Sequence, residues 1–316
     1  MRVVVALGGN ALMRRGEPLE ASVQREHVAE AARSIAALAK HHSLLLTHGN
    51  GPQVGLLALQ SESYRAVRPY PLDVLVAESE GMIGYLLEQA LQNELSGRQV
   101  ATVLTEVDVD LADPAFAHPT KPVGPVYTEG EAHRLATEHG WQVARDGAGY
   151  RRVVASPEPR RIVEMETIRR LVDTGAIVIC AGGGGIPVFV DPASGRREGI
   201  EAVIDKDLSA ALLAIQVEAD FLMLLTDVDA VEEGWGGPGA RPIRSATPAR
   251  LRSLSFAAGS MAPKIEAACR FVEATGRRAG IGSLARASEI LAGRSGTSIA
   301  PTEAQATAGT SYEAIS

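Results

Sequence analysis

The ten residues VVVALGGNAL, positions 3–12, join a run of strand-forming apolar side chains to two consecutive glycines and an asparagine. Glycine loses more conformational entropy on folding than any other residue, so two glycines directly after a strand need a physical reason. A tight turn requires only one of them. The second glycine, followed by a short amide side chain, indicates that a ligand approaches the backbone closely at this point.

The composition is that of an ordinary globular protein. The chain has 316 residues, of which 46% are hydrophobic and 22% are charged. This length suits one large α/β domain or two smaller ones. The formal net charge of −7 argues against a dedicated nucleic-acid binder, although local lysines can still bind an anionic substrate. We therefore expect no nucleic-acid partner.

Cysteine usage and hydropathy bear on the compartment. Cys180 and Cys269 lie in apolar sequence without a CxxC spacing, which predicts two buried thiols rather than a disulfide or a metal site. No apolar run approaches membrane-spanning length, and the apolar segment after Arg2 is too short for a signal-peptide core. We expect a cytoplasmic protein with no membrane partner.

Short apolar runs alternate with helical periodicity along the chain. Runs rich in β-branched residues predict strands buried on both faces of a sheet, at positions 3–7, 44–47, 99–105, 176–180 and 221–226. Apolar spacing predicts helices over 22–40, 51–67 and 73–95, with Pro52 in a first turn and Asp73 as an N-cap. This alternation predicts an α/β protein with a mainly parallel sheet and helices on both faces.

Some segments depart from this alternation. Residues 113–161 are rich in Pro, Gly and charge, which predicts a protruding excursion such as a small hairpin lid. We expect a surface loop over 232–241 and a mobile tail over 301–316.

Glycine-rich loops follow three of the predicted strands: LGGNA (7–11), THGNGPQVG (47–55) and AGGGGIPV (181–188). In a parallel sheet all three lie at the carboxyl edge, where open α/β sheets bind ligands. A helix N-terminus after such a loop attracts an anion by about 0.3–1 kcal/mol. Three loops of this density favour an anion site over three ordinary turns. The absence of GxxxxGK[ST] and of a dinucleotide fingerprint disfavours P-loop and nicotinamide enzymes.

Two lysines stand near predicted helix starts. Lys206 lies between Asp205 and Asp207, and Lys264 follows Pro263. A cation there opposes the helix dipole, so neither lysine is placed for helix stability alone. Each by itself could be a solvated lysine paired with an aspartate. Together with the glycine loops they predict a clamp for a polyphosphate, in which one Lys–phosphate contact contributes about 4 kcal/mol before desolvation.

The remaining charged and titratable candidates are weaker. Lys121 is framed by prolines in HPTKPVGP and could reach down from the excursion as a third cation, although an isolated lysine there is ordinarily a surface residue. The seven histidines form no metal constellation. His48, beside Gly49, is the one in a candidate site, and a core or turn role is its more ordinary explanation.

Long stretches of this chain resemble the carbamate kinases of the amino-acid kinase superfamily: VVVALGGNAL, THGNGPQVGLL, ATVLTEVDVDLADPAF with PTKPVGPVYTE, ICAGGGGIPV, GIEAVIDKDLSAALLA, LLTDVDAV and GSMAPKIEAACRFVE. The resemblance runs in order over roughly residues 1 to 300. It does not extend to the tail after Pro301, and DGAGYRRVVASPEP is substituted in detail.

The resemblance implies a three-layer αβα sandwich with a mainly parallel central sheet and a protruding lid subdomain, in a homodimer. On this basis residues 1–316 form a single amino-acid kinase domain. Residues 1–200 form the carbamate or phosphoryl-acceptor half, which includes the 113–161 lid, and residues 201–300 form the nucleotide-binding half.

The resemblance also implies roles for residues. Lys206 and Lys264 would contact the transferring phosphoryl group, Asp207 would orient them, and Lys121 would reach in from the lid. The carbamate and γ-phosphate site would be lined by Gly8, Gly9, Asn10, Gly49, Asn50, Gly51, Gly183 and Gly184. The nucleotide would lie near Thr226, Asp227, Val228, Asp229 and Met261.

The implied reaction is reversible phosphoryl transfer between ATP and carbamate, giving ADP and carbamoyl phosphate, in arginine metabolism. Carbamate is already an oxyanion, so its attack on phosphorus needs no general base, and positioning with charge neutralisation suffices. Mg²⁺ is expected with the nucleotide, held mainly by phosphate oxygens and water, and we name no protein ligand for it.

Two alternatives remain open at this stage. The first is another acyl-phosphate-forming kinase, such as an acetylglutamate kinase-like enzyme, which would need a larger pocket with an arginine for a second carboxylate. The loops GGN and HGNG carry no arginine. The second is a non-catalytic nucleotide sensor, against which the presence of Lys206, Asp207 and Lys264 argues.

Overall fold

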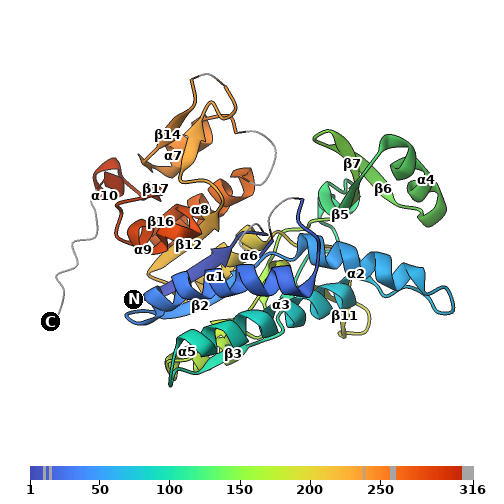
Figure 1. Cartoon of the computed structure of the whole chain (residues 1–316), viewed down its shortest axis with the longest axis horizontal. Coiled ribbons are helices and arrows are strands. Elements are labelled where there is room, and N and C mark those ends of the chain that lie inside the picture. Colours follow the sequence, from blue (N-terminus) through green and yellow to red (C-terminus); the bar gives the residue numbers. More distant parts are fainter. Residues whose placement is uncertain (10–11, 14–15, 238, 257–260, 308–316) are drawn as a thin grey trace.

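The centre of the fold is an eight-stranded sheet in the order β15-β17-β16-β12-β1-β2-β9-β3 (Figure 1). The computed structural model describes residues 1–9, 12–13, 16–237, 239–256 and 261–307. All neighbouring strands are parallel except β16 and β17. The strands are β1 (Arg2–Leu7), β2 (Ser43–His48), β3 (Val100–Thr102), β9 (Ile177–Ile179), β12 (Phe221–Thr226), β15 (Ser245–Ala246), β16 (Arg278–Ser283) and β17 (Thr297–Ile299).

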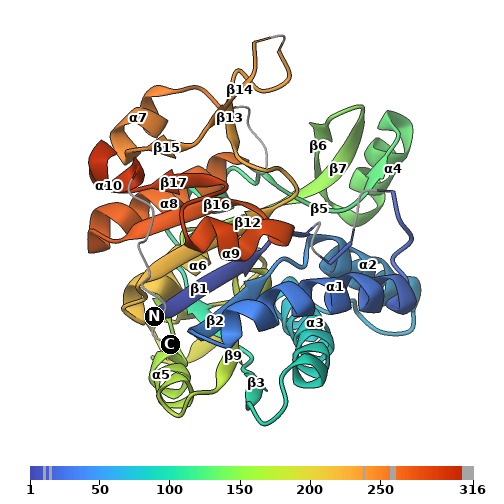
Figure 2. The ribbon, with the colours of Figure 1, turned by 60° about the vertical axis from the view of Figure 1, so that its left-hand side comes forward.

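Each face of this sheet carries its own hydrophobic core, because successive side chains of a strand point to opposite faces. Val3 and Val5 of β1 pack with α1 (Ala21–Ala39), α3 (Leu72–Glu94) and α9 (Ala287–Leu291). Val4 and Ala6 pack with α5 (Met165–Asp173), α6 (Lys206–Gln216) and α8 (Met261–Thr275). The result is the expected three-layer αβα sandwich, and Figure 2 shows α1 and α3 on one side of β1 and β2.

Several predicted boundaries are wrong for identifiable reasons. The predicted strand 99–105 ends at Thr102, because the chain then leaves the central sheet and β4 (Glu106–Asp108) pairs with β10 (Ile186–Val190). That second sheet also contains β8 (Arg161–Ile162) and β11 (Arg197–Gly199). Asp73 is not the N-cap of α3: Pro71 holds that position and Asp73 lies in the first turn. The helix predicted over 51–67 ends earlier, as α2 (Gly51–Ser63).

The C-terminal part also contains structure that the pattern did not predict. The predicted loop 232–241 includes the ends of an antiparallel hairpin, β13 (Val231–Glu233) and β14 (Arg241–Ile243). Helix α7 (Pro248–Ser253) follows it. The segment 301–316 begins with helix α10 (Glu303–Thr307), and residues 308–316 lie outside the described part. Among the described helices, none combines the length and the apolar character needed to cross a membrane.

Within the predicted excursion 113–161, residues 121–154 form a small unit with its own sheet, and the name lid is used from here on for these residues; Arg161 pairs with β4 in the second sheet instead. It contains a three-stranded sheet of β5 (Lys121–Tyr127), β7 (Gly149–Val154) and β6 (Gln142–Asp146), with helix α4 (Glu129–His139) against it. A capping box starts α4: Thr128 and Glu131 each accept from the other's backbone N–H. Figures 1 and 2 show the lid standing apart from the central sheet, above α2.

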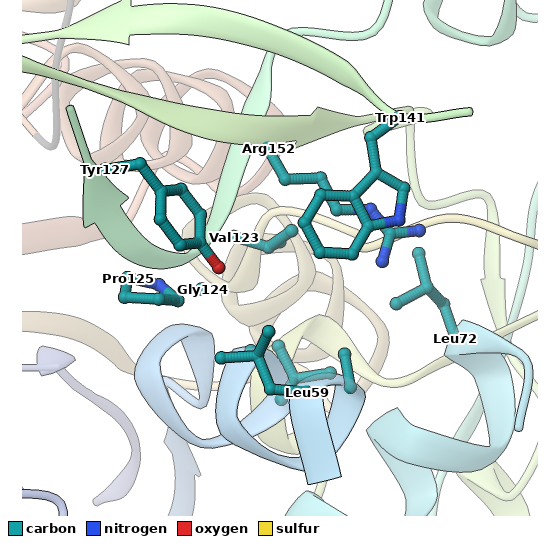
Figure 3. A pocket seen from close by; sticks show the side chains of 11 residues that line it. Leu59, Leu72, Val123, Gly124, Pro125, Tyr127, Trp141 and Arg152 are labelled. Carbon is teal, nitrogen blue, oxygen red and sulfur yellow. The ribbon is translucent and has the colours of Figure 1, made fainter. Parts of the chain in front are cut away.

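The lid rests on α2 through a glycine–glycine contact. A Cβ atom added at Gly55 of α2 would lie 2.0 Å from the Cα of Gly124, which has a φ of +74°. Figure 3 shows the crevice beside this contact, where Trp141 and Arg152 of the lid face Leu59 and Leu72 below. The lid backbone therefore approaches α2 as closely as side-chain-free residues permit.

We expect Gly55→Ala to lift the lid, because the new methyl group meets backbone rather than a flexible side chain, and overpacking of this kind costs about 1–3 kcal/mol. Amide hydrogen exchange measured by mass spectrometry should accelerate about tenfold in β5 and β7 and stay unchanged in β1. The control is Gly130→Ala in α4, where no atom lies within 4 Å of the added Cβ. Unchanged exchange in the lid of Gly55→Ala would contradict this description.

Candidate active site

The three glycine-rich loops meet because the strands before them are neighbours. β1, β2 and β9 are adjacent and parallel, so all three loops leave the same edge of the sheet. β12 lies on the other side of β1, which makes this the point where the strand order changes direction and α/β sheets bind ligands.

The first two glycine loops contact each other, and the second also contacts Lys206. A Cβ atom at Gly8 would lie 2.8 Å from the carbonyl oxygen of Leu225 in β12. A Cβ atom at Gly49 would lie 3.4 Å from the amide nitrogen of Gly9 and 3.4 Å from Cε of Lys206. Gly8 and Gly49 thus allow close approach between segments of the protein itself, whereas a Cβ atom at Gly9 would meet no atom within 4 Å; close approach of a ligand to Gly9 stays a prediction. Asn10 lies outside the described residues.

Asn50 stands at the N-cap of α2 but does not cap it. Its Nδ2 donates to Oγ of Ser79 at 2.9 Å, and no side-chain hydrogen bond closes the helix end. Since Pro52 has no N–H and the N–H of Val54 donates to Asn50, the first turn can offer an anion the N–H groups of Gly51 and Gln53.

The third loop is a short 3₁₀ turn, Gly182–Gly184, rather than the start of an α-helix. A Cβ atom at Gly183, where φ is +67°, would lie 2.1 Å from Nδ2 of Asn50. Ser209 of α6 donates to the carbonyl oxygen of Gly184 at 2.7 Å. The turn is therefore held between the second loop and α6.

The two predicted lysines share one carboxylate. Nζ of Lys206 lies 2.6 Å from Oδ1 of Asp207, and Nζ of Lys264 lies 2.8 Å from Oδ2. Lys206 and Asp207 open α6, whose N-cap Asp205 accepts from the backbone N–H groups of Asp207 and Leu208. Both Lys264 and Asp207 are only 4% exposed. We name Lys206, Asp207 and Lys264 the ammonium cluster.

Burial and charge act together on this cluster. Burial alone would raise the pKa of Asp207, but the two ammonium groups hold it well below its usual range. Burial, together with the neighbouring Lys264, lowers the pKa of Lys206 to about 8. Burial would lower the pKa of Lys264 as well, but the Asp207 carboxylate outweighs it and raises that pKa. Two cations on one anion leave a net positive charge, which suits a bound anion.

Lys121 does not join the ammonium cluster in this structure. From the start of β5 its Nζ reaches Oδ2 of Asp205 at a distance of 2.5 Å. The contact ties the lid to the N-cap of α6, next to the cluster. A direct contact between Lys121 and a phosphoryl group stays a prediction.

The residues predicted to bind nucleotide lie on the β12 side of β1. Thr226 ends β12, and its hydroxyl donates to Oδ1 of Asp227 at 3.1 Å. Asp227 and Asp229 are exposed, Val228 is half-buried, and half-buried Met261 opens α8, the helix of Lys264. Lys264 therefore belongs to the same helix as Met261, whereas Lys206 and Asp207 come from α6, whose Ser209 also holds the third glycine loop.

The sequence analysis missed a buried acid behind the glycine loops. Glu80 of α3 is 1% exposed, and its carboxyl oxygens accept from the backbone N–H groups of Gly182 at 2.8 Å and Thr105 at 3.3 Å. The available signal was its position in the apolar stripe of α3, between buried Val76 and Ile83. His48 is buried, as its more ordinary explanation implied.

Metal-ligating side chains do not gather in the described part of the chain. No group of three or more His, Cys, Asp or Glu is placed there to hold an ion. Both carboxyl oxygens of Asp207 already face ammonium groups.

The class of protein follows from the fold and a family match. The amino acid kinase family model matches residues 1–283, and the chain belongs to this family. More particularly, it is 56% identical over 301 residues to a carbamate kinase of Rhizobium meliloti (strain 1021), covering 95% of this chain and 93% of that one.

Solved structures agree with that assignment. Carbamate kinase from Giardia lamblia bound to AMP-PNP superimposes with a TM-score of 0.86 at 40% identity, covering 95% and 98% of the two chains. N-acetylglutamate synthase from Neisseria gonorrhoeae, complexed with coenzyme A and L-arginine, has a TM-score of 0.59 at 18% identity, covering 95% and 61%, and shows the fold alone. The resemblance to carbamate kinases is confirmed.

We expect anion binding at the ammonium cluster to weaken as the pH rises through about 8, because Lys206 then loses its proton. Affinity for AMP-PNP, measured by calorimetry against the Lys206→Ala variant under the same conditions, should fall on the order of tenfold between pH 8 and pH 9.5. Lys206→Ala should bind more weakly at pH 7.5 and show a flat profile. Identical profiles for the two proteins would contradict the assignment.

Proposed function

We propose that this protein catalyses reversible phosphoryl transfer between ATP and carbamate, giving ADP and carbamoyl phosphate, the reaction that names its relatives. The observation that carries the proposal is the ammonium cluster, with two buried lysines on Asp207 and a net positive charge. It lies beside Gly49 and Gly9 at the carboxyl edge of the sheet, where backbone N–H groups can surround an oxyanion.

In the forward reaction a carbamate oxygen bonds to the γ-phosphorus of ATP as the bond from that phosphorus to the β–γ bridging oxygen breaks. The electron pair of the broken bond stays on ADP, and no proton moves. Lys206 and Lys264 neutralise the charge on the transferring group. Asp207 orients the two lysines, since both of its oxygens are occupied by them and neither is free to act as a base.

The two substrates approach from opposite sides of the cluster. We place carbamate and the γ-phosphate against Gly8, Gly9, Asn50 and the Gly182–Gly184 turn, within the acceptor half of residues 1–200. We place the adenine nucleotide against the 226–231 loop and Met261, in the half of residues 201–300. Lys121 and the lid close the site from above, starting from the contact with Asp205.

Mg²⁺ fits this site as part of the nucleotide substrate. It would be held by phosphate oxygens and water, which suits an ion that keeps several of its waters, and it would add charge neutralisation on the phosphates. The chain's own contribution remains the fixed ammonium groups and backbone N–H groups.

The proposal extends to assembly and place in the cell. We propose a homodimer, and α3 presents a suitable surface with Val74, Met82 and Tyr85 exposed at helical spacing. We propose a cytoplasmic enzyme of arginine metabolism, and the free thiols of Cys180 and Cys269 agree with a reducing compartment.

A donor comparison tests the substrate. ATP formation from ADP should be fastest with carbamoyl phosphate, slower by at least about a hundredfold with acetyl phosphate, and absent with acetylglutamyl phosphate. For acetylglutamyl phosphate the reason is that the loops GGN and HGNG contain no arginine and so offer no partner for a second carboxylate. A better rate with acetylglutamyl phosphate would favour the rival kinase, and nucleotide binding without any ATP formation would favour a sensor.

Removing one lysine should cost activity rather than folding. Lys206→Ala or Lys264→Ala should lower kcat about 10²–10³-fold, as loss of one transition-state contact does. Asp207 keeps its other lysine in each variant, so circular dichroism and the melting temperature should change little. The matched control is Lys40→Ala at the exposed end of α1. Turnover near that of the wild type in both variants would refute the clamp.

A further inference from the structure

Two consecutive residues of α3 each hold one of the glycine-rich loops. Ser79 is fully buried; its hydroxyl accepts from Nδ2 of Asn50 at 2.9 Å and donates to the carbonyl oxygen of Val76 at 2.9 Å. Glu80 accepts from the backbone N–H of Gly182 at 2.8 Å. α3 itself supplies none of the residues assigned to substrate, so these contacts act on the site from behind.

The two loops held in this way are in direct contact with each other. The position of a Cβ atom on Gly183 lies within 2.5 Å of three side-chain atoms of Asn50. A Cβ atom on Gly182 would lie 2.3 Å from Nε2 of His48 and 2.9 Å from Cγ of Glu80. A shift of Glu80 therefore moves the turn against Asn50, and with it the wall of the acceptor site.

The groups around Glu80 offer no charge to balance a carboxylate. Its carboxyl oxygens accept from the backbone N–H groups of Gly182 and Thr105, and the Cys180 thiol and the acid Glu164 are close enough to interact with it electrostatically. In the described part of the chain no lysine or arginine pairs with Glu80. Burial raises the pKa of Glu80 to about 8, so the carboxyl group is mainly uncharged at neutral pH.

His48 completes an uncharged layer. Its Nδ1 lies 3.1 Å from the carbonyl oxygen of Gly49, so Nδ1 carries the proton and donates. Nε2 then presents a lone pair, and it is buried without a hydrogen-bond partner among the described residues. Burial lowers the pKa of His48 to about 4, which keeps the ring neutral. A neutral layer behind the loops leaves the positive charge of the ammonium cluster to the phosphoryl group.

We propose that Glu80 is a positioning residue of the acceptor site: together with Ser79, it sets the spacing between Asn50 and the Gly182–Gly184 turn. This inference rests on the proposed function, because the acceptor is the substrate that the two loops would contact.

The test compares variants that separate side-chain length from charge, with ATP formation from ADP and carbamoyl phosphate at pH 7.5. Glu80→Gln keeps the length and an oxygen for the Gly182 N–H, and it should keep KM for carbamoyl phosphate within about threefold of the wild type. Glu80→Asp keeps the acid but is one methylene shorter, and it should raise that KM at least tenfold. KM for ADP should change less than threefold in both, because the nucleotide lies on the β12 side.

Ser79→Ala should raise KM for carbamoyl phosphate in the same selective way, since it frees Asn50. The matched control is Glu78→Gln, which changes an exposed carboxylate one residue before Ser79 and should alter neither constant. The melting temperature of Glu80→Ala shows how much the side chain contributes to stability. If that variant does not fold, the comparison of Glu80→Gln with Glu80→Asp still tests the positioning role.

The outcomes separate this inference from the proposed function. If the wild type makes no ATP from carbamoyl phosphate, the proposed function fails. If the wild type is active but Glu80→Gln loses as much as Glu80→Asp, the uncharged role is wrong. If both constants stay at wild-type values in Glu80→Asp and Ser79→Ala, or rise equally for the two substrates, the positioning role is wrong.

Discussion

The ammonium groups of Lys206 and Lys264 share the buried carboxylate of Asp207, and the rest of the site is built around these three charges. Asp207 joins Lys206 of its own helix to Lys264 of α8, so the pair of ion contacts also fastens two helices on the same face of the sheet. Loss of Asp207 would cost about 3–5 kcal/mol, because two buried ammonium groups would be left without their shared counter-charge. In the cluster as a whole two ammonium groups face one carboxylate, so one positive charge remains, and the proposed phosphoryl group would balance it.

Around the ammonium cluster and under the lid, glycines stand at positions where a side chain would collide with its neighbours. Gly49 lies against Lys206, Gly183 against Asn50, and Gly55 against Gly124 of the lid, each at a distance that a Cβ atom would make tight or impossible. These contacts bring backbone segments closer together than residues with side chains would allow. A glycine–glycine contact also lets the lid rest on α2. Glycine therefore sets both the position of the lid and the close packing of the loops below it.

Charge is confined to one layer of the site. Lys206, Asp207 and Lys264 are ionised, whereas His48 and Glu80, behind the glycine loops, are held neutral by burial. A second carboxylate there would compete with the phosphoryl group for the lysines. A neutral acid and a neutral ring hold the loops through hydrogen bonds and contact alone, which fits catalysis by fixed charge rather than by proton transfer.

The sequence by itself determined the elements whose causes are local. β1 and β12 are continuous apolar runs because both of their faces are buried, and Asp205 caps α6 within its own turn, so these features, the glycine loops and the lysines of the site were predictable. Only the tertiary structure decided that the strand after residue 99 stops at Thr102, that Lys121 meets Asp205 across 84 positions, and that Glu80 lies under Gly182. These contacts depend on how segments that are far apart in the sequence pack together. The local sequence pattern does not specify which distant residue will fill a given space.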